Sequence, residues 1–123
     1  MFVLDESGSV GPYNFERMKT FVSELIGVFV VEGGYSQVAV VTYSTSVGET
    51  FNLVAHTSVA SLQSAISSLS FSGGGTNTAE ALHYVSSVML TREAGDRNTT
   101  PNAVVVITDG YSMDPTATQV SIY

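Results

Sequence analysis

The sequence predicts an α/β fold: a Rossmann-like, doubly wound sandwich in which a mostly parallel sheet carries helices on both faces. Short runs of apolar and β-branched residues alternate along the chain with segments whose apolar residues recur at helical spacing. This alternation is typical of strands joined by crossover helices. One link, residues 44–48, is too short for a crossover. We therefore expect one antiparallel hairpin at an edge of the otherwise parallel sheet.

The first strand and the first helix follow from apolar residues and their spacing. Residues 2–4 are uniformly apolar and predict a short buried strand. Gly11-Pro12 then breaks the chain, and proline suits the first turn of a helix. Apolar side chains keep helical spacing for about five turns beyond it, at Phe15, Met18, Val22, Leu25 and Phe29. We expect this helix to end at Gly33-Gly34.

The hairpin and the second helix come next. Residues 37–43 and 49–54 are rich in apolar and β-branched side chains, and they predict two strands paired antiparallel across the short link. A second helix is marked by apolar residues at helical spacing, namely Val59, Leu62, Ile66 and Leu69. Ser58, directly before this helix, is a typical N-cap residue.

The last part of the chain predicts two more helices and a strand. A third helix is expected from about Ala79 to Leu90, and Glu80 follows Asn77 by three residues, as in a capping box. The apolar segment "AVVVITDG" predicts a strand of the kind that is buried on both faces. Asp114-Pro115 supplies the cap and first residue of one more helix.

The composition limits the classes of function. The chain of 123 residues suffices for one domain with a core, and it lacks cysteine, which excludes disulfides, thiolate catalysis and Cys-ligated zinc. Acidic residues number 11 against 4 basic ones, and the formal charge of −7 argues against nucleic acid and anionic membrane surfaces as partners. No apolar run reaches the roughly 18–20 residues of a membrane span, so we expect no direct membrane insertion.

Two features bear on the origin of the chain. Asn98-Thr99-Thr100 is a glycosylation sequon in a polar loop, and it hints at a secreted protein. The amino end shows no signal peptide and begins within a predicted strand. We therefore expect a piece of a larger protein.

Oxygen-bearing side chains follow the predicted strands, where an apolar core would reject them. Asp5, Ser7 and Ser9 follow the first strand, Thr76 lies in the glycine-rich loop, and Asp109 follows "VVVIT". Ligands of open α/β sheets bind outside the carboxyl ends of the strands, so neighbouring strands would bring these side chains to one crevice. The set offers oxygen but neither nitrogen nor sulfur. Hard divalent cations, Mg²⁺ in particular, bind such ligands.

Three segments, "DESGS", "GGGTNTAEAL" and "VVVITDGYSMD", resemble in their order and spacing the von Willebrand factor type A domain with its metal-ion-dependent adhesion site. The resemblance implies that Ser7, Ser9 and Thr76 supply hydroxyl ligands to a cation, while Asp5 and Asp109 act directly or through water. It covers essentially the whole chain, but the family fold normally continues with two more strands and a final helix. We therefore expect residues 1–123 to form a partial type A domain.

Each predicted ligand also has a purely structural alternative. Ser7 or Ser9 could cap the first helix, and Thr76 or its neighbour Asn77 could cap the third. Asp109, which precedes a glycine, could be a turn residue. Independent caps, however, would have no reason to converge on one place.

Three other titratable residues are not expected to take part in the site. Glu6 occupies a variable position of the motif, and we expect it to stay solvated and to add local negative potential. His56 and His83 lie far apart without acidic partners in the sequence. We expect both histidines to be surface or packing residues.

The resemblance implies an extracellular binding or adhesion module that grips a protein ligand through the bound cation. An acidic residue of the ligand would complete the coordination. Mg²⁺ is the expected ion, with Mn²⁺ or Ca²⁺ as alternatives, and a matrix protein such as a collagen is an expected kind of ligand. The alternative function is an intracellular assembly module of a multiprotein complex, because type A domains also occur in cytosolic complexes.

Catalysis is disfavoured by the same residues. Asp5 at a strand end resembles the nucleophile of phosphotransferases, but those carry Asp-x-Asp, and Ser7 stands at the second position here. No Gly-x-Ser-x-Gly elbow surrounds Ser7 or Ser9, and "GGGTNT" lacks the lysine of a phosphate-binding loop. We therefore expect the chain not to be an enzyme, a metal-dependent phosphatase included.

Overall fold

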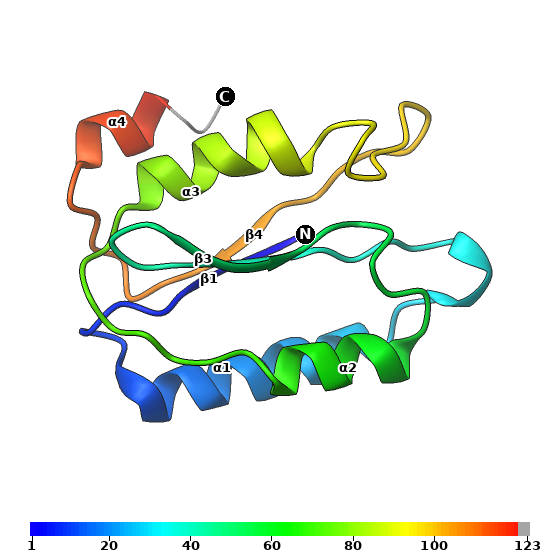
Figure 1. The fold of residues 1–123 in the computed structure, drawn as a ribbon, viewed down its shortest axis with the longest axis horizontal. Coiled ribbons are helices and arrows are strands. Elements are labelled where there is room, and N and C mark those ends of the chain that lie inside the picture. Colours follow the sequence, from blue (N-terminus) through cyan, green and yellow to red (C-terminus); the bar gives the residue numbers. More distant parts are fainter. Residues whose placement is uncertain (121–123) are drawn as a thin grey trace.

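The computed structural model describes residues 1–120, which form a four-stranded sheet with helices on both faces (Figure 1). Besides α-helices and strands it contains a short 3-10 helix, η1, and a π-helical turn, η2. The elements in chain order are β1 (Phe2–Asp5), α1 (Gly11–Ile26), η1 (Glu32–Gly34), β2 (Val40–Tyr43), β3 (Val47–Phe51), α2 (Val59–Ser67), α3 (Thr78–Tyr84), η2 (Val85–Met89), β4 (Val105–Ile107) and α4 (Pro115–Val120).

The predicted doubly wound topology is confirmed. The strand order is β3-β2-β1-β4, with β1 parallel to both β2 and β4, and with β3 antiparallel to β2 at one edge. Helices α1 and α2 cover one face of the sheet, and α3 and α4 cover the other (Figure 1). The chain runs outward from β1 to β3 and then returns to the opposite side of β1. The strand order therefore reverses at β1, where sheets of this type bind ligands.

Two apolar layers hold the helices against the sheet. Side chains of successive strand residues point to opposite faces, so Phe2 and Leu4 join the core under α1 and α2 while Val3 joins the core under α3. Val40 and Val41 alternate in the same way. Both faces of the two central strands are buried, which accounts for their continuous apolar sequence.

The predicted helix caps are confirmed. The Ser61 amide donates to the Ser58 hydroxyl at 3.1 Å at the start of α2. Asn77 caps α3 by accepting from the Glu80 amide at 3.2 Å. Asp114 caps α4, where its Oδ1 accepts from the Ala117 amide at 2.9 Å. No helix among residues 1–120 is long and apolar enough to cross a membrane.

The predicted end of the first helix is wrong. Helix α1 ends at Ile26 rather than at Gly33-Gly34, and the Gly27 amide closes its last turn on the Glu24 carbonyl at 3.1 Å. Residues 28, 30 and 31 are valines, and β-branched side chains lose rotamer freedom in a helix. Because the helix has ended, the apolar face expected to include Phe29 does not continue. Val31 is buried in the core instead, while Phe29 stays 37% exposed.

The prediction that the "AVVVITDG" strand is buried on both faces is also wrong. β4 spans only Val105–Ile107, and Val105 is 40% exposed. The reason is position in the sheet, since β4 pairs with β1 on one side and forms the edge of the four described strands. A continuous apolar run does not distinguish an edge strand from a central one.

Candidate metal site

The candidate site begins where β1 and β4 end side by side. Leu4 is opposite Ile107 in this parallel pair, so the next residues, Asp5 and Thr108, are neighbours. The Thr108 hydroxyl donates to Asp5 Oδ2 at 2.7 Å, and the Ser7 amide donates to Asp5 Oδ1 at 2.9 Å. Asp5 is fully buried. Both of its oxygens are therefore held in place by hydrogen bonds at the floor of the site.

A line of oxygen atoms runs from this floor to the surface. The Ser7 and Ser9 hydroxyls lie 3.2 Å apart, and the Ser9 hydroxyl donates a hydrogen bond to Asp109 Oδ2. Ser7 is buried, whereas Ser9 and Asp109 are exposed. The structure thus brings four of the five predicted ligands together, and the outer two face solvent.

Thr76, the fifth predicted ligand, lies on a glycine-rich loop that is bonded to both of the other loops. The Gly8 amide donates to the Gly74 carbonyl at 2.9 Å, and the Met113 amide donates to the Thr76 carbonyl at 2.8 Å. Gly74 has φ +103°, a backbone conformation that residues other than glycine rarely adopt. Figure 1 shows that α1, α3 and α4 all begin at this end of the sheet.

The cap alternatives for the hydroxyl residues do not hold. Helix α1, all of which the structure describes, has no side-chain cap, so neither Ser7 nor Ser9 serves it. Helix α3 is capped by Asn77 rather than Thr76. Asp109 does accept from the Tyr111 amide as a turn residue would, but at a long 3.5 Å.

The donor set fits a hard cation better than a soft one. It consists of two carboxylates and three neutral hydroxyls, all oxygen. Among residues 1–120 no group of three or more His, Cys, Asp or Glu side chains could hold a metal ion. A cation held by Asp5 and Asp109 would therefore depend on the hydroxyls of Ser7, Ser9 and Thr76 and on water.

The expectation that Glu6 stays solvated is wrong. Glu6 is only 3% exposed, and its Oε1 accepts from the Thr42 hydroxyl at 3.1 Å. Its Oε2 is buried without a hydrogen bond of good geometry in the described part of the chain. Burial raises the pKa of Glu6 above its ordinary value of 4.5, and the charge of Glu49 adds to this, against the lowering effect of nearby Thr42 and Ser72. The carboxylate lies beside β2 and β3, away from the predicted ligands.

Sequence reasoning missed two residues that support the site. Thr108 orients Asp5, and its place directly after β4 and before Asp109 could have indicated this. Tyr43 is fully buried on the α3 side of the sheet, with its hydroxyl 3.2 Å from that of Thr78. Burial raises the pKa of Tyr43 above 10.0, and the negative charges of Asp5 and Asp109 raise it further. Tyr43 is therefore a neutral neighbour of the two carboxylates.

The histidines behave as expected. His56 packs edge-on against Phe51, with ring centroids 5.0 Å apart, and His83 is exposed on α3. Asn98, the glycosylation candidate, is exposed in the loop that precedes β4.

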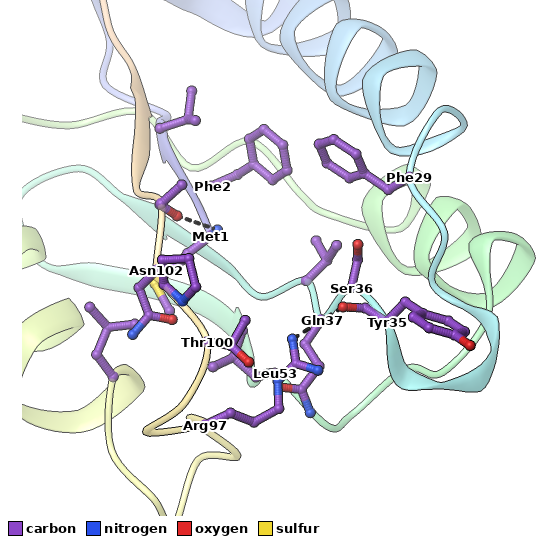
Figure 2. A pocket seen from close by; sticks show the side chains of 15 residues that line it. Met1, Phe2, Phe29, Tyr35, Ser36, Gln37, Leu53, Arg97, Thr100 and Asn102 are labelled. Carbon is purple, nitrogen blue, oxygen red and sulfur yellow. Dashed lines mark hydrogen bonds between the residues drawn. The ribbon is translucent and has the colours of Figure 1, made fainter.

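A separate pocket lies at the opposite end of the sheet (Figure 2). It has a volume of about 230 Å³ and is lined by Met1, Phe2 and Val105, at the starts of β1 and β4. Arg97 lies at this pocket and donates to the Gly34 carbonyl at 2.6 Å. None of the predicted ligands lines it. The pocket is therefore distinct from the candidate metal site.

The family model for the von Willebrand factor type A domain, which describes the sequences of that family, matches residues 1–122. The chain belongs to the von Willebrand factor type A family. This confirms the family resemblance found in the sequence, and the α/β fold agrees with it.

Curated relatives of this type A domain include several matrix proteins. It is 38% identical to von Willebrand factor A domain-containing protein 2 of Xenopus laevis over 94% of the chain, 34% to human Matrilin-1 over 93%, and 36% to mouse Collagen alpha-4(VI) chain over 94%. The chain spans only 15%, 23% and 5% of these proteins, respectively.

Solved structures give the same fold. Proximal thread matrix protein 1 from the mussel byssus superposes with a TM-score of 0.87 at 28% identity, over 98% of this chain and 33% of that one. Another structure of the mussel protein, with a TM-score of 0.86 at 27% identity and the same coverage, has zinc in its metal-ion-dependent adhesion site.

Proposed function

We propose that this type A domain binds a protein ligand outside the cell through a divalent cation. The proposed ligands of the cation are Asp5, Ser7, Ser9, Thr76 and Asp109. The observation that carries the proposal is the Ser9–Asp109 hydrogen bond, which joins loops 100 residues apart in the sequence. Convergence over that distance is hard to explain by local capping. The zinc-bound adhesion site of the mussel protein supports a metal at this motif.

The proposed ligands fall into a buried group and a solvent-facing group. Asp5, fixed by Thr108 and by the Ser7 amide, forms a rigid buried floor. Ser9 and Asp109 stand at the solvent side, where a ligand can approach. A bound cation supplies an electrophilic position for a carboxylate oxygen of the ligand. If only one of Asp5 and Asp109 contacts the cation directly, the three neutral hydroxyls leave the cation with net positive charge, which favours a Glu or Asp of the partner over water.

Mg²⁺ is the proposed ion in place, with Mn²⁺ or Ca²⁺ as alternatives. Zinc prefers nitrogen and sulfur ligands, which this donor set does not offer. Zinc nevertheless occupies the corresponding site in the mussel protein. The preference for Mg²⁺ over Zn²⁺ is therefore relative, and a competition between the two ions measures it.

The partner we propose is an extracellular matrix protein, for example a collagen, rather than nucleic acid. Three observations support an extracellular location: the relationship to Matrilin-1, the relationship to a collagen VI chain, and the exposed sequon at Asn98. The charge of −7 does not oppose an acidic ligand group, because distant surface charges are screened beyond roughly 8–10 Å at physiological salt, whereas the ion acts at bonding distance. Glycosylation of Asn98 and the extent of the domain beyond residues 1–123 stay predictions.

The function is non-catalytic in this proposal. The Ser7 and Ser9 hydroxyls contact each other and a carboxylate, and His56 packs against Phe51 instead. Within the described residues neither serine hydroxyl is hydrogen-bonded to a histidine, so the Ser–His pair that activates a serine nucleophile is not formed.

The test is binding of the protein to immobilised matrix proteins, collagens included, in Mg²⁺, in EDTA, and after Mg²⁺ is restored. We expect EDTA to abolish binding and Mg²⁺ to restore it, and Asp5→Asn to lose binding in all three conditions. Glu24→Gln, an exposed acidic position on α1, is the matched control. Binding that survives EDTA would place the interaction on another face of the domain.

A further inference from the structure

Thr76 is held in place by a turn that supplies none of the proposed ligands. We propose that Thr45, in the turn between β2 and β3, is a positioning residue for Thr76. The inference rests on the proposed function, and it adds a residue that lies outside the three motif segments.

The backbone on both sides of Thr76 is bonded to this turn. The Gly75 amide, directly before Thr76, donates to the Thr45 hydroxyl at 2.9 Å. The Asn77 amide, directly after it, donates to the Ser44 carbonyl at 2.7 Å. Two consecutive turn residues therefore accept from the amides of the residues on either side of the proposed ligand.

Only one of these two bonds depends on a side chain. The bond to the Ser44 carbonyl uses backbone atoms and survives substitution, whereas the bond from Gly75 needs the Thr45 hydroxyl. The approach is close, because a Cβ on Gly74 would lie 3.0 Å from Thr45 Oγ1, and one on Gly75 would lie 3.3 Å from it. The absence of side chains at both glycines thus gives the Thr45 hydroxyl its access to the loop.

Loss of the Thr45 hydroxyl would free a segment that has little stiffness of its own. Residues 73–75 are three consecutive glycines, which have the widest choice of backbone angles. The Met113 amide and the Gly8 amide still bond the Thr76 and Gly74 carbonyls. The loop would therefore stay in place on average while the Thr76 hydroxyl lost its fixed orientation. A metal ligand needs that orientation more than the fold does.

The experiment compares hydroxyl-free and hydroxyl-bearing variants of Thr45 in the full-length protein. Thr45→Val keeps the shape and removes the acceptor, Thr45→Ala is a second hydroxyl-free variant, and Thr45→Ser keeps the hydroxyl. Thr50→Val, an exposed threonine on β3 of the same hairpin, is the matched control. The readouts are Mg²⁺ affinity by calorimetry, melting temperature in EDTA, and hydrogen exchange of peptides covering residues 72–77 in EDTA.

We expect Thr45→Val to weaken Mg²⁺ binding by about three- to tenfold, the effect of one hydrogen bond of ordinary strength. Exchange across residues 72–77 should be faster, while the melting temperature stays near that of Thr45→Ser and Thr50→Val. Equal Mg²⁺ affinity in the Val and Ser variants would overturn the inference, and so would an equal loss in both. If the wild-type protein itself binds no Mg²⁺, the proposed metal site fails instead. In that case the hydrogen-exchange rates of residues 72–77 alone decide whether Thr45 holds the loop.

Discussion

Gly48 of β3 faces the Glu6 carboxylate so closely that no side chain fits between them. A Cβ at Gly48 would overlap Glu6 Oε1 and would lie 2.5 Å from the Thr42 hydroxyl. The Glu49 amide donates to the same hydroxyl at 2.8 Å, and the register of β2 against β3 is irregular between Val41 and Tyr43. The hairpin is therefore built around a buried acidic side chain that comes from the loop after β1, between the proposed ligands Asp5 and Ser7.

The first prediction concerns this contact. Gly48→Ala should destabilise the protein by about 1–3 kcal/mol, the usual effect of inserting a methyl group where there is no space. Urea unfolding measures it. The double variant Glu6→Ala/Gly48→Ala should recover part of the loss, because the Glu6 carboxylate is then gone and only the clash with the Thr42 hydroxyl is left. Strictly additive effects in this double-mutant cycle would show that Glu6 is not the obstacle.

The second prediction follows from the raised pKa of Glu6. Between the ordinary value of 4.5 and the raised pKa, the folded state binds more protons than the unfolded state. The free energy of unfolding therefore falls as the pH rises through this window, and the stabilising effect of the proton is fully present only below it. Glu6→Gln should lose this part of the pH dependence. The measurement is urea unfolding in EDTA from about pH 4 upward, and parallel curves for the two proteins would contradict it.

The third prediction concerns stabilisation by metal. The carboxylates of Asp5 and Asp109 converge, so binding of Mg²⁺ to the folded state should raise the melting temperature by mass action, with about 2.7 kcal/mol expected at 100 times the dissociation constant. Ser9→Ala should reduce this gain with little change in the metal-free protein. Ser64→Ala, an exposed serine on α2, should leave the gain intact. Identical melting curves with and without millimolar Mg²⁺ would speak against the site.

The fourth prediction separates stability from binding. Lys19 of α1 is buried and donates to the carbonyls of Ser67 and Leu69 at 3.0 and 2.8 Å, so it fastens the end of α2 to α1. Lys19→Met keeps the apolar stem but leaves these carbonyls without their charged donor. We expect a loss of about 1.5–3 kcal/mol in urea unfolding, with Mg²⁺ affinity unchanged at temperatures where the variant is folded. A parallel loss of Mg²⁺ affinity would link this helix pair to the metal loops.

Much of the fold and most of the candidate site follow from local patterns. Caps such as Ser58 and Asn77 are local, so the sequence predicts them well. The meeting of Asp5 and Asp109 also follows, because carboxyl ends of neighbouring parallel strands share one edge of a sheet.

Features that depend on tertiary neighbours could not be predicted in the same way. Glu6 is buried because β2 and β3 close over it, and nothing in its local sequence reports this. Val105 stays exposed because of its place in the strand order, and Thr45 reaches the glycine loop only across the hairpin. Such contacts join segments far apart in the chain, and periodicity carries no information about them.

The Ser9–Asp109 contact also has a consequence for the order of events during synthesis. The two residues lie 100 positions apart in the chain, and a ribosome adds about 5–20 residues per second, so roughly 5–20 s pass between their appearance. Throughout that interval the nascent chain carries Asp5, Ser7 and Ser9 without their partner. If the proposed site binds a cation, metal capture is one of the last steps open to the nascent domain, because the proposed ligands are complete only after the chain from the first strand to the last described strand has been made.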